Sequence, residues 1–135
     1  MLEAHLQEVP FFSTLSKREL GEVARATDEI DVKEGKVLAR EGDVGQEFFV
    51  ILEGTAEVTR GDERIAALGR GEFFGEMALL GDERRMATVT ATAPMRLAVM
   101  SRSAFRGFDR TLPEMHQRVC DAIEARRAAA HAHAH

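Results

Sequence analysis

The regular spacing of glycines and acidic residues between about positions 29 and 100 is the feature that most restricts the fold. In this stretch short apolar segments alternate with turn signals such as Glu34-Gly35, Gly61-Asp62 and Gly69-Arg70-Gly71. The segments between the turns have the composition of β-strands, namely 29–32, 37–40, 47–53, 55–60, 63–68, 86–91 and 95–100. Many short strands at close spacing are typical of antiparallel sandwiches and jelly rolls, so the sequence predicts a jelly-roll-like antiparallel β-barrel.

Helical patterns flank this strand-rich region. Ser16 and Glu19 form a capping box, which predicts an N-terminal helix beginning after Ser16. Apolar residues then recur at helical spacing. A separate helical turn is expected at 76–80, where good helix formers lie between Gly75 and Gly81.

Two further helices are predicted at the C-terminal end. Ser101 is a candidate cap for the first, and Pro113 suits the first position of the second, whose apolar stripe ends near Arg127. We therefore predict one domain over 1–127 and a frayed or disordered Ala/His tail over 128–135. The tail could hold a metal loosely, but we interpret it as a disordered end and assign no metal site to its histidines, His131, His133 and His135.

Composition and charge exclude several classes of partner. The 135 residues are 44% hydrophobic and 30% charged, with 18 basic and 23 acidic residues and a net charge of −5. An acidic surface repels phosphate backbones, so we expect no direct DNA binding. The apolar runs are too short to span a bilayer and no signal-peptide pattern is present, so no membrane association is expected. The single cysteine, Cys120, excludes an internal disulfide and fits a cytoplasmic location.

The sequence argues against an enzyme. No histidine lies between His5 and His116, so the strands offer no imidazole ligand to a catalytic metal. No serine lies in a nucleophile elbow, and Cys120 has no convincing base partner. We therefore predict no catalytic residues and a binding function.

The stretch from Gly71 to Val89 carries the most informative chemistry. Gly75 and Glu76 open the helical turn, and backbone N–H groups at such a turn attract anions. Arg85 adds a positive charge and a planar donor fork that suits phosphate. A carboxylate at the start of the turn can accept hydrogen bonds from sugar hydroxyls. Together these groups point to a small phosphorylated sugar or a nucleotide.

Two patterns in this stretch carry a resemblance to a known family. They are Phe-Gly-Glu-Met-Ala-Leu at 74–79 and Arg-Met-Ala-Thr-Val at 85–89. A Gly-acid pair at 42–43, an aromatic-rich strand at 48–51 and Gly54 form a second matching signature. The chain resembles the cyclic nucleotide-binding domain family over about 11–127. That family includes catabolite activator proteins, regulatory subunits of cAMP-dependent protein kinase and cyclic nucleotide-gated channels.

The resemblance implies roles for individual residues. Arg85 would neutralise the cyclic phosphate, and Glu76 would accept from the ribose 2′-hydroxyl. Backbone N–H groups near Gly75, Ala78 and Ala87 would complete the set of contacts around the phosphate and the ribose. The implied ligand-binding residues are Gly75, Glu76, Met77, Ala78, Arg85, Met86, Ala87 and Thr88. The last helix would close over the base as a lid, through Met115, Val119 or Ile123. The phenylalanines of the strand region, Phe48, Phe49, Phe73 and Phe74, are assigned to the core alone.

The implied function is that of a stand-alone sensor of a cyclic nucleotide, with no further cofactor. The two patterns and the insert between them, residues 74–89, resemble the family's phosphate-binding cassette. The residue after its arginine, Arg85, is Met86. A hydroxyl at that position is associated in the family with cGMP, so cAMP is favoured over cGMP. The last helix would signal to an unidentified effector protein or to a second copy of the chain, as a possible homodimer.

Two departures from the family pattern keep alternatives open. Arg84 stands where proline is common, and Met86 puts bulk near the expected base. One alternative is a degenerate domain that has lost its ligand and serves as a protein-interaction module. Another is a binder of a cyclic dinucleotide that uses the same arginine. A cavity filled by Met86, or an Arg85 turned out to water, would contradict the sensor hypothesis.

Overall fold

A computed structural model describes the backbone of residues 2–81 and 83–133, and the side chains of these residues up to 129. The helices are α1 (Leu2–Gln7), the 3-10 turn η1 (Pro10–Phe12), α2 (Lys17–Arg25), the 3-10 turn η2 (Glu76–Leu79), α3 (Arg102–Thr111) and α4 (Pro113–His133). The strands are β1 (Asp28–Val32), β2 (Val37–Ala39), β3 (Glu47–Glu53), β4 (Ala56–Arg60), β5 (Glu63–Leu68), β6 (Phe73–Phe74), β7 (Thr88–Ala91) and β8 (Met95–Ser101).

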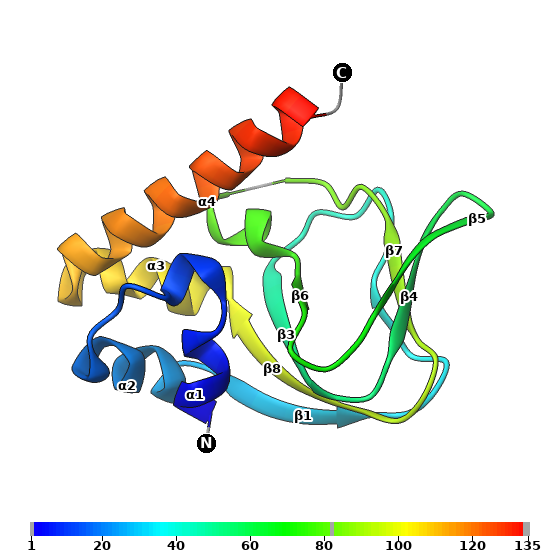
Figure 1. The fold of residues 1–135 in the computed structure, drawn as a ribbon, viewed down its shortest axis with the longest axis horizontal. Helices are drawn as coiled ribbons and strands as arrows, with labels where there is room; N and C mark the ends of the chain where they lie inside the picture. Colours follow the sequence, from blue (N-terminus) through cyan, green and yellow to red (C-terminus); the bar gives the residue numbers. More distant parts are fainter. Residues whose placement is uncertain (1, 82, 134–135) are drawn as a thin grey trace.

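The strands form two antiparallel sheets. One sheet has the order β1-β8-β3-β6, and the other has the order β2-β7-β4-β5. The two sheets lie against each other at one end of the molecule, and the helices gather at the other end (Figure 1). The predicted fold, mainly antiparallel β with flanking helices, is confirmed, although the sheets do not close into a complete barrel.

Strand β3 is buried on both faces, which explains its unbroken apolar run. Phe48 and Val50 face a core shared with the helices, whereas Phe49 and Ile51 face the core between the two sheets. Successive side chains of a strand point to opposite faces, so a strand between two layers must be apolar throughout. Because β3 and its neighbour β8 lie in the middle of their sheet and contribute side chains to both cores, these two strands join the sheet core to the helical core.

Side-chain caps begin two of the helices. Ser16 Oγ accepts a hydrogen bond from Glu19 N at 3.1 Å, and Glu19 Oε1 accepts one from Ser16 N at 2.8 Å. This arrangement is the predicted capping box. At α3, Ser101 Oγ accepts from Ala104 N at 3.0 Å, as a serine cap should.

The structure corrects several predicted boundaries. The N-terminal region contains α1 and η1 in addition to the one predicted helix, and the short strand β6 was missed. Strand β7 begins at Thr88 and not at residue 86. The last helix was expected to end near Arg127 but continues to His133, so the backbone of 128–133 is helical. Ala134 and His135 lie outside the described residues, as do the side chains of the other tail histidines.

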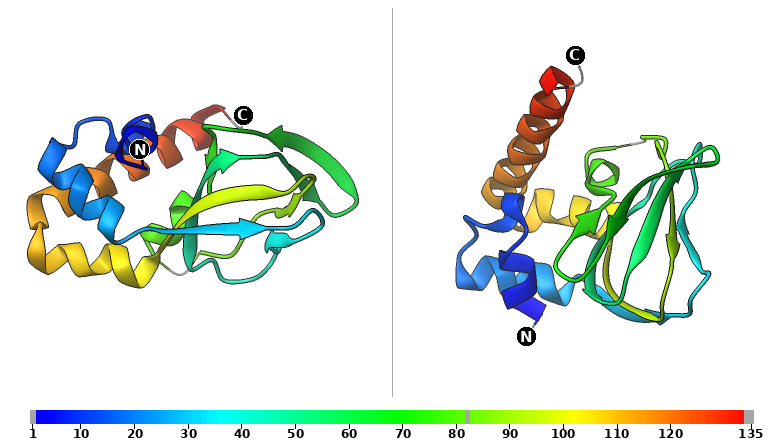
Figure 2. Two further views of the ribbon diagram at one scale, coloured as in Figure 1. Left: turned by 90° about the horizontal axis from the view of Figure 1, so that it is seen from below. Right: turned by 45° about the vertical axis from the view of Figure 1, so that its right-hand side comes forward.

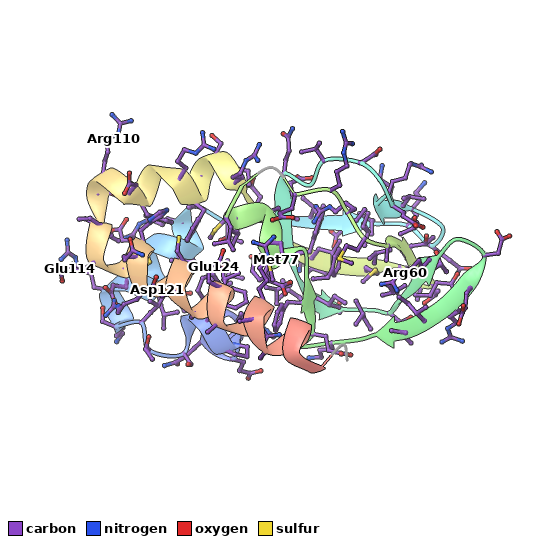
Figure 3. All side chains as sticks on the ribbon, turned by 90° about the horizontal axis from the view of Figure 1, so that it is seen from above. Arg60, Met77, Arg110, Glu114, Asp121 and Glu124 are labelled. Atoms are coloured by element: carbon purple, nitrogen blue, oxygen red, sulfur yellow. The ribbon has the colours of Figure 1, made fainter. Side chains whose placement is uncertain are left out.

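The direction of α4 places its second half near the sheets. Seen from above, α4 runs diagonally from the helical end of the molecule toward the sheets (Figure 3). In the right-hand view of Figure 2, the C-terminal half of α4 projects beyond the helical layer. Within residues 2–81 and 83–133, none of the helices has the length and hydropathy of a membrane span.

Candidate functional site

A cavity of about 670 Å³ opens between η2, the segment around residues 83–87 and the sheet that contains β7. Its volume lies within the range of small-molecule binding sites. It is lined by Ala39, Val58, Phe74, Gly75, Glu76, Met77, Ala78, Glu83, Arg84, Arg85, Met86, Ala87, Val89 and Arg127. All of the ligand-binding residues expected from the sequence line it except Thr88. The hydroxyl of Thr88 instead accepts a hydrogen bond from Glu41 N at 3.0 Å.

Arg85 is held at the wall of this cavity and is not turned out to water. Its Nη2 donates to the backbone carbonyl of Glu47 at 2.8 Å. Burial lowers the pKa of Arg85, and the nearby carboxylates of Glu47 and Glu76 act in the opposite direction. Burial disfavours the charged form of a group because it removes the group from water. A negative charge placed beside Arg85 would act against this effect and favour the charged guanidinium.

Two glycines make room for the Arg85 side chain. A Cβ at Gly75 would lie 2.6 Å from Nη1 of Arg85 and 2.8 Å from the carbonyl oxygen of Glu47. A Cβ at Gly45 would lie 2.8 Å from Cζ of Arg85. Gly75 also has a φ of +83°, which L side chains rarely adopt, and this turn leads from β6 into η2. The position of the guanidinium therefore depends on glycine at both sites.

The backbone on either side of Arg85 is fixed by pairing with the turn at 42–45. Arg85 N donates to Asp43 O at 2.7 Å, and Gly42 N donates to Arg85 O at 2.9 Å. Arg84 reinforces the same pairing, because its Nη1 donates to Gly42 O at 2.8 Å. The departure from the family proline thus adds a side-chain bond that holds this loop.

Glu76 lies at the start of η2 and lines the cavity on the same side as Arg85. Its charge acts on the pKa of Arg85, so the two groups are close enough to interact. The N–H of Ala78, expected to point at a phosphate, donates to Gly75 O at 3.1 Å within the turn. A carboxylate and a guanidinium therefore supply the main polar groups on this wall.

The opposite wall is apolar. Ala39, Val58 and Val89 come from β2, β4 and β7, which lie next to one another in one sheet. Phe74 stacks on Phe49 with ring centroids 4.7 Å apart, and it also lines the cavity. Phe74 packs against the core between the sheets, as predicted, and in addition it forms part of the cavity lining. An apolar wall facing a charged wall suits a ligand with a flat apolar part and an anionic part.

Met86 lines the cavity without filling it. Its side chain is 76% exposed, and its backbone carbonyl accepts a hydrogen bond from Nε of Arg60 at 3.3 Å. Met77 packs partly against the helical core and also lines the cavity. The two outcomes that would have contradicted the sensor hypothesis, a plugged cavity and an outward Arg85, are both absent here among the described residues.

The residues expected to form a lid lie elsewhere. Met115, Val119 and Ile123 are fully buried in the helical core and do not line the cavity. Among the side chains of α4 described, which reach residue 129, Arg127 lines the cavity, and it forms an ion pair with Glu83. Neither residue of this pair was predicted, because Arg127 follows the apolar stripe and Glu83 lies in the variable insert of the cassette.

Within the described residues, no group of three or more metal-binding side chains lies together. On α4, Cys120 lies 3.9 Å from the ring nitrogens of His116. Burial, reinforced by acidic neighbours such as Asp121, raises the pKa of the Cys120 thiol. A raised pKa lowers the thiolate fraction and makes a nucleophilic role for Cys120 unfavourable.

Two curated relatives share more than a third of their aligned residues with this chain. A cAMP-dependent protein kinase regulatory subunit of Blastocladiella emersonii is 37% identical over 123 residues, covering 87% of this chain and 30% of that subunit. The subunit of the same description from Hypocrea atroviridis is 36% identical over 106 residues, covering 78% of this chain and 23% of that subunit. The chain therefore spans less than a third of the length of these relatives.

Solved structures agree on the fold. The N-terminal domain of a transcriptional regulator from Streptomyces coelicolor A3(2) superposes with a TM-score of 0.84 at 24% identity, covering 93% of this chain and 94% of that chain. The catabolite activator protein of Thermus thermophilus gives a TM-score of 0.75 at 28% identity, covering 89% of this chain and 58% of that chain. A family model matches residues 29–111, which is more than half of the sequence, and by this match the chain belongs to the cyclic nucleotide-binding domain family.

Proposed function

We propose that this domain binds cAMP, in preference to cGMP, and acts as a regulatory sensor rather than as an enzyme. The observation that carries the proposal is the half-buried guanidinium of Arg85, which lines an open cavity together with Glu76 and donates to the Glu47 carbonyl. Arg85 would bind the cyclic phosphate, and Glu76 would accept from the ribose 2′-hydroxyl. The apolar wall of Ala39, Val58 and Val89 would take the base.

The openness of the cavity favours a ligand-binding domain over a degenerate interaction module. That alternative depended on Met86 occupying the place of the base, whereas the Met86 side chain is 76% exposed and leaves the cavity open. The regulatory subunits that this chain resembles support an effector protein as the partner. A cytoplasmic setting is part of the same proposal.

Signalling would follow from a shift between two positions of α4. A ligand moves such an equilibrium only by binding one state more tightly than the other. Because α4 contributes Arg127 to the cavity wall, a bound nucleotide can distinguish the two positions. The displaced or captured helix would then alter the surface seen by an effector or by a second copy of the chain.

Calorimetric titration with cAMP, cGMP and a cyclic dinucleotide tests the proposal. Arg85→Ala should weaken cAMP binding by roughly 2–5 kcal/mol, or about thirty- to several-thousand-fold. Arg110→Ala is the control for net charge, because Arg110 projects from the helical end, away from the sheets (Figure 3). It should bind as the parent does.

If Arg85→Ala bound cAMP as tightly as the parent, Arg85 would not be a binding residue of this site. If the parent bound none of the three nucleotides at millimolar concentration, the degenerate module would be the better description.

The ribose contact has its own test. A site built to hydrogen-bond a hydroxyl rejects an analogue that lacks it. The parent should therefore bind 2′-deoxy-cAMP at least tenfold more weakly than cAMP, an effect of about 1.4 kcal/mol. In Glu76→Gln this discrimination should shrink. If the variant keeps the parent's full discrimination, Glu76 does not read the 2′-hydroxyl.

A further inference from the structure

The second half of α4 is attached to the rest of the protein by two adjacent arginines. Ile123 is the last fully buried residue of α4 with a described side chain, and among residues 124–129 only Arg127 is not exposed. The guanidinium of Arg126 lies 5.0 Å from the ring centroid of Phe73 on β6. Arg127 forms its ion pair with Glu83. Polar contacts therefore hold this half of the helix, whereas apolar packing holds the first half.

The partner of Arg127 belongs to the segment that carries Arg85. Glu83 O accepts a hydrogen bond from Gly45 N at 2.8 Å, and Arg85 N donates to Asp43 O at 2.7 Å. Glu83 is thus fixed two residues before the guanidinium expected to bind phosphate. Arg127 and Glu83 also both line the cavity, so their ion pair forms part of its wall.

We propose that the Glu83–Arg127 ion pair is a strap that closes the cavity on the side of α4 and fastens this helix to the phosphate-binding segment. The proposal rests on the proposed function, because the strap is assigned to the nucleotide site. Glu124 supports it, since its Oε1 accepts from Nη1 of Arg127 at 3.5 Å and orients the guanidinium. The wall of the site would then include two residues outside the matched patterns at 74–79 and 85–89, one before Arg85 and one on α4.

The exposure of the pair fits a strap that opens and closes. The side chains of Arg127 and Glu83 are 35% and 39% exposed. Ion pairs in contact with solvent stabilise only weakly, so breaking this one should change an opening equilibrium by about two- to fivefold. Opening would release the helix from the segment that carries Arg85. A nucleotide that leaves past this wall must separate the pair, so the strap should slow dissociation.

Hydrogen exchange of the ligand-free protein tests the strap without any nucleotide. Glu83→Gln is the decisive variant, because it changes no residue of α4. It should speed exchange of the amides of residues 125–129 by about two- to fivefold, since exchange reports the population of the open state. Arg127→Gln should do at least as much, and the double variant should be no faster than Arg127→Gln alone.

A matched control separates the strap from a general loosening of α4. Arg118 pairs with Glu19 of the N-terminal helical region at 2.6 Å, so Arg118→Gln removes the same charge and an ion pair from the same helix. It should leave exchange at 125–129 unchanged. Unchanged exchange in Glu83→Gln would overturn the proposal, and so would effects of Glu83→Gln and Arg127→Gln that multiply in the double variant.

The cAMP dissociation rate tests the link to the ligand. Measured by competition with unlabelled nucleotide, the rate should rise about two- to fivefold in Glu83→Gln and in Arg127→Gln, without a further rise in the double variant. Arg118→Gln should match the parent. Faster exchange with an unchanged dissociation rate would show that the pair fastens α4 but does not close the site, and would refute closure. If the parent binds no nucleotide, the proposed function fails, and the exchange experiment still decides whether the strap exists.

Discussion

The dependence of Arg85 on two glycines gives the sharpest prediction. Alanine at Gly75 would place its Cβ 2.6 Å from the guanidinium of Arg85 and 2.8 Å from the Glu47 carbonyl, at a φ of +83°. The left-handed backbone costs about 1–2 kcal/mol, and loss of the charged hydrogen bond from Arg85 costs about 1.5–3 kcal/mol. Alanine also has less conformational freedom than glycine in the unfolded chain, which offsets about 0.4–1 kcal/mol of this loss. Gly75→Ala should therefore lower the free energy of unfolding by about 3 kcal/mol.

Two matched glycine variants separate backbone strain from the contact with Arg85. Gly71 has a φ of +88° with nothing within 4 Å of a Cβ, so Gly71→Ala introduces strain alone. Its cost should be about 1 kcal/mol. Gly45 is outside the positive-φ glycines, and its Cβ would meet the tip of the Arg85 side chain at 2.8 Å. That tip can move, so Gly45→Ala should displace the guanidinium and lose its hydrogen bond, at a cost to the fold of about 1.5 kcal/mol.

Thermal unfolding and calorimetric titration with cAMP would be measured on the three variants. For a domain of this size, 3 kcal/mol corresponds to roughly 10–15 °C in Tm. The Tm of Gly75→Ala should fall by about that amount, that of Gly45→Ala by about half of it and that of Gly71→Ala by about a third of it. The affinity for cAMP should follow a different order. Gly45→Ala should bind at least tenfold more weakly than the parent, a loss of about 1.4 kcal/mol, whereas Gly71→Ala should bind as the parent does. The reasoning is refuted if Gly75→Ala is no less stable than Gly71→Ala, or if Gly45→Ala binds cAMP as the parent does.

The remaining predictions concern pH, selectivity and thiol reactivity. The backbone N–H of Ser16, more than the charge of Arg118, lowers the pKa of Glu19 below its ordinary value of 4.5. The ionised Glu19 therefore stabilises the fold above that value, and this contribution is lost as the pH falls through the lower native pKa. The difference in free energy of unfolding between the parent and Glu19→Gln should accordingly shrink when denaturant titrations are carried out at acid pH. Met86→Thr should raise the affinity for cGMP relative to cAMP in competition assays, and an unchanged ratio would contradict the assignment of Met86 to selectivity. Because burial raises the pKa of Cys120, this thiol should alkylate more slowly than free cysteine at neutral pH, and equal rates would argue against its buried setting.

Strand and cap signals predicted most of the fold because they are local. The Ser16–Glu19 capping box and the strand at 47–53 are set by residues that are close in the sequence. Strand β6 was missed because it has only two residues, and its pairing with Phe49 and Val50 defines it. The end of α4 was placed too early because the apolar stripe stops before the helix does. Alanine's high helix propensity continues the helix without burial.

The charged wall of the site was predictable, and the apolar wall was not. Gly75, Glu76 and Arg85 form a recognisable local pattern. Ala39 and Val58 are small apolar residues on strands far from the cassette, with no feature that separates them from the core. The order β2-β7-β4 brings them beside Val89, and that order is a property of the whole sheet. Tertiary pairing therefore supplies the part of the site that would face the base.

In the proposed mechanism, weak attachments at Arg126 and Arg127 would let a ligand control α4. A contact worth about 1 kcal/mol favours the closed position of α4 over the open one by only about five to one. A ligand that binds one position more tightly by about 1.4 kcal/mol therefore shifts this equilibrium tenfold. Apolar packing at Ile123 is much stronger, because fully burying such a side chain contributes about 1.5–3 kcal/mol. A tie of that strength would keep the helix closed with or without nucleotide. We therefore expect the response to be confined to the part of α4 after Ile123, where polar contacts replace the apolar core.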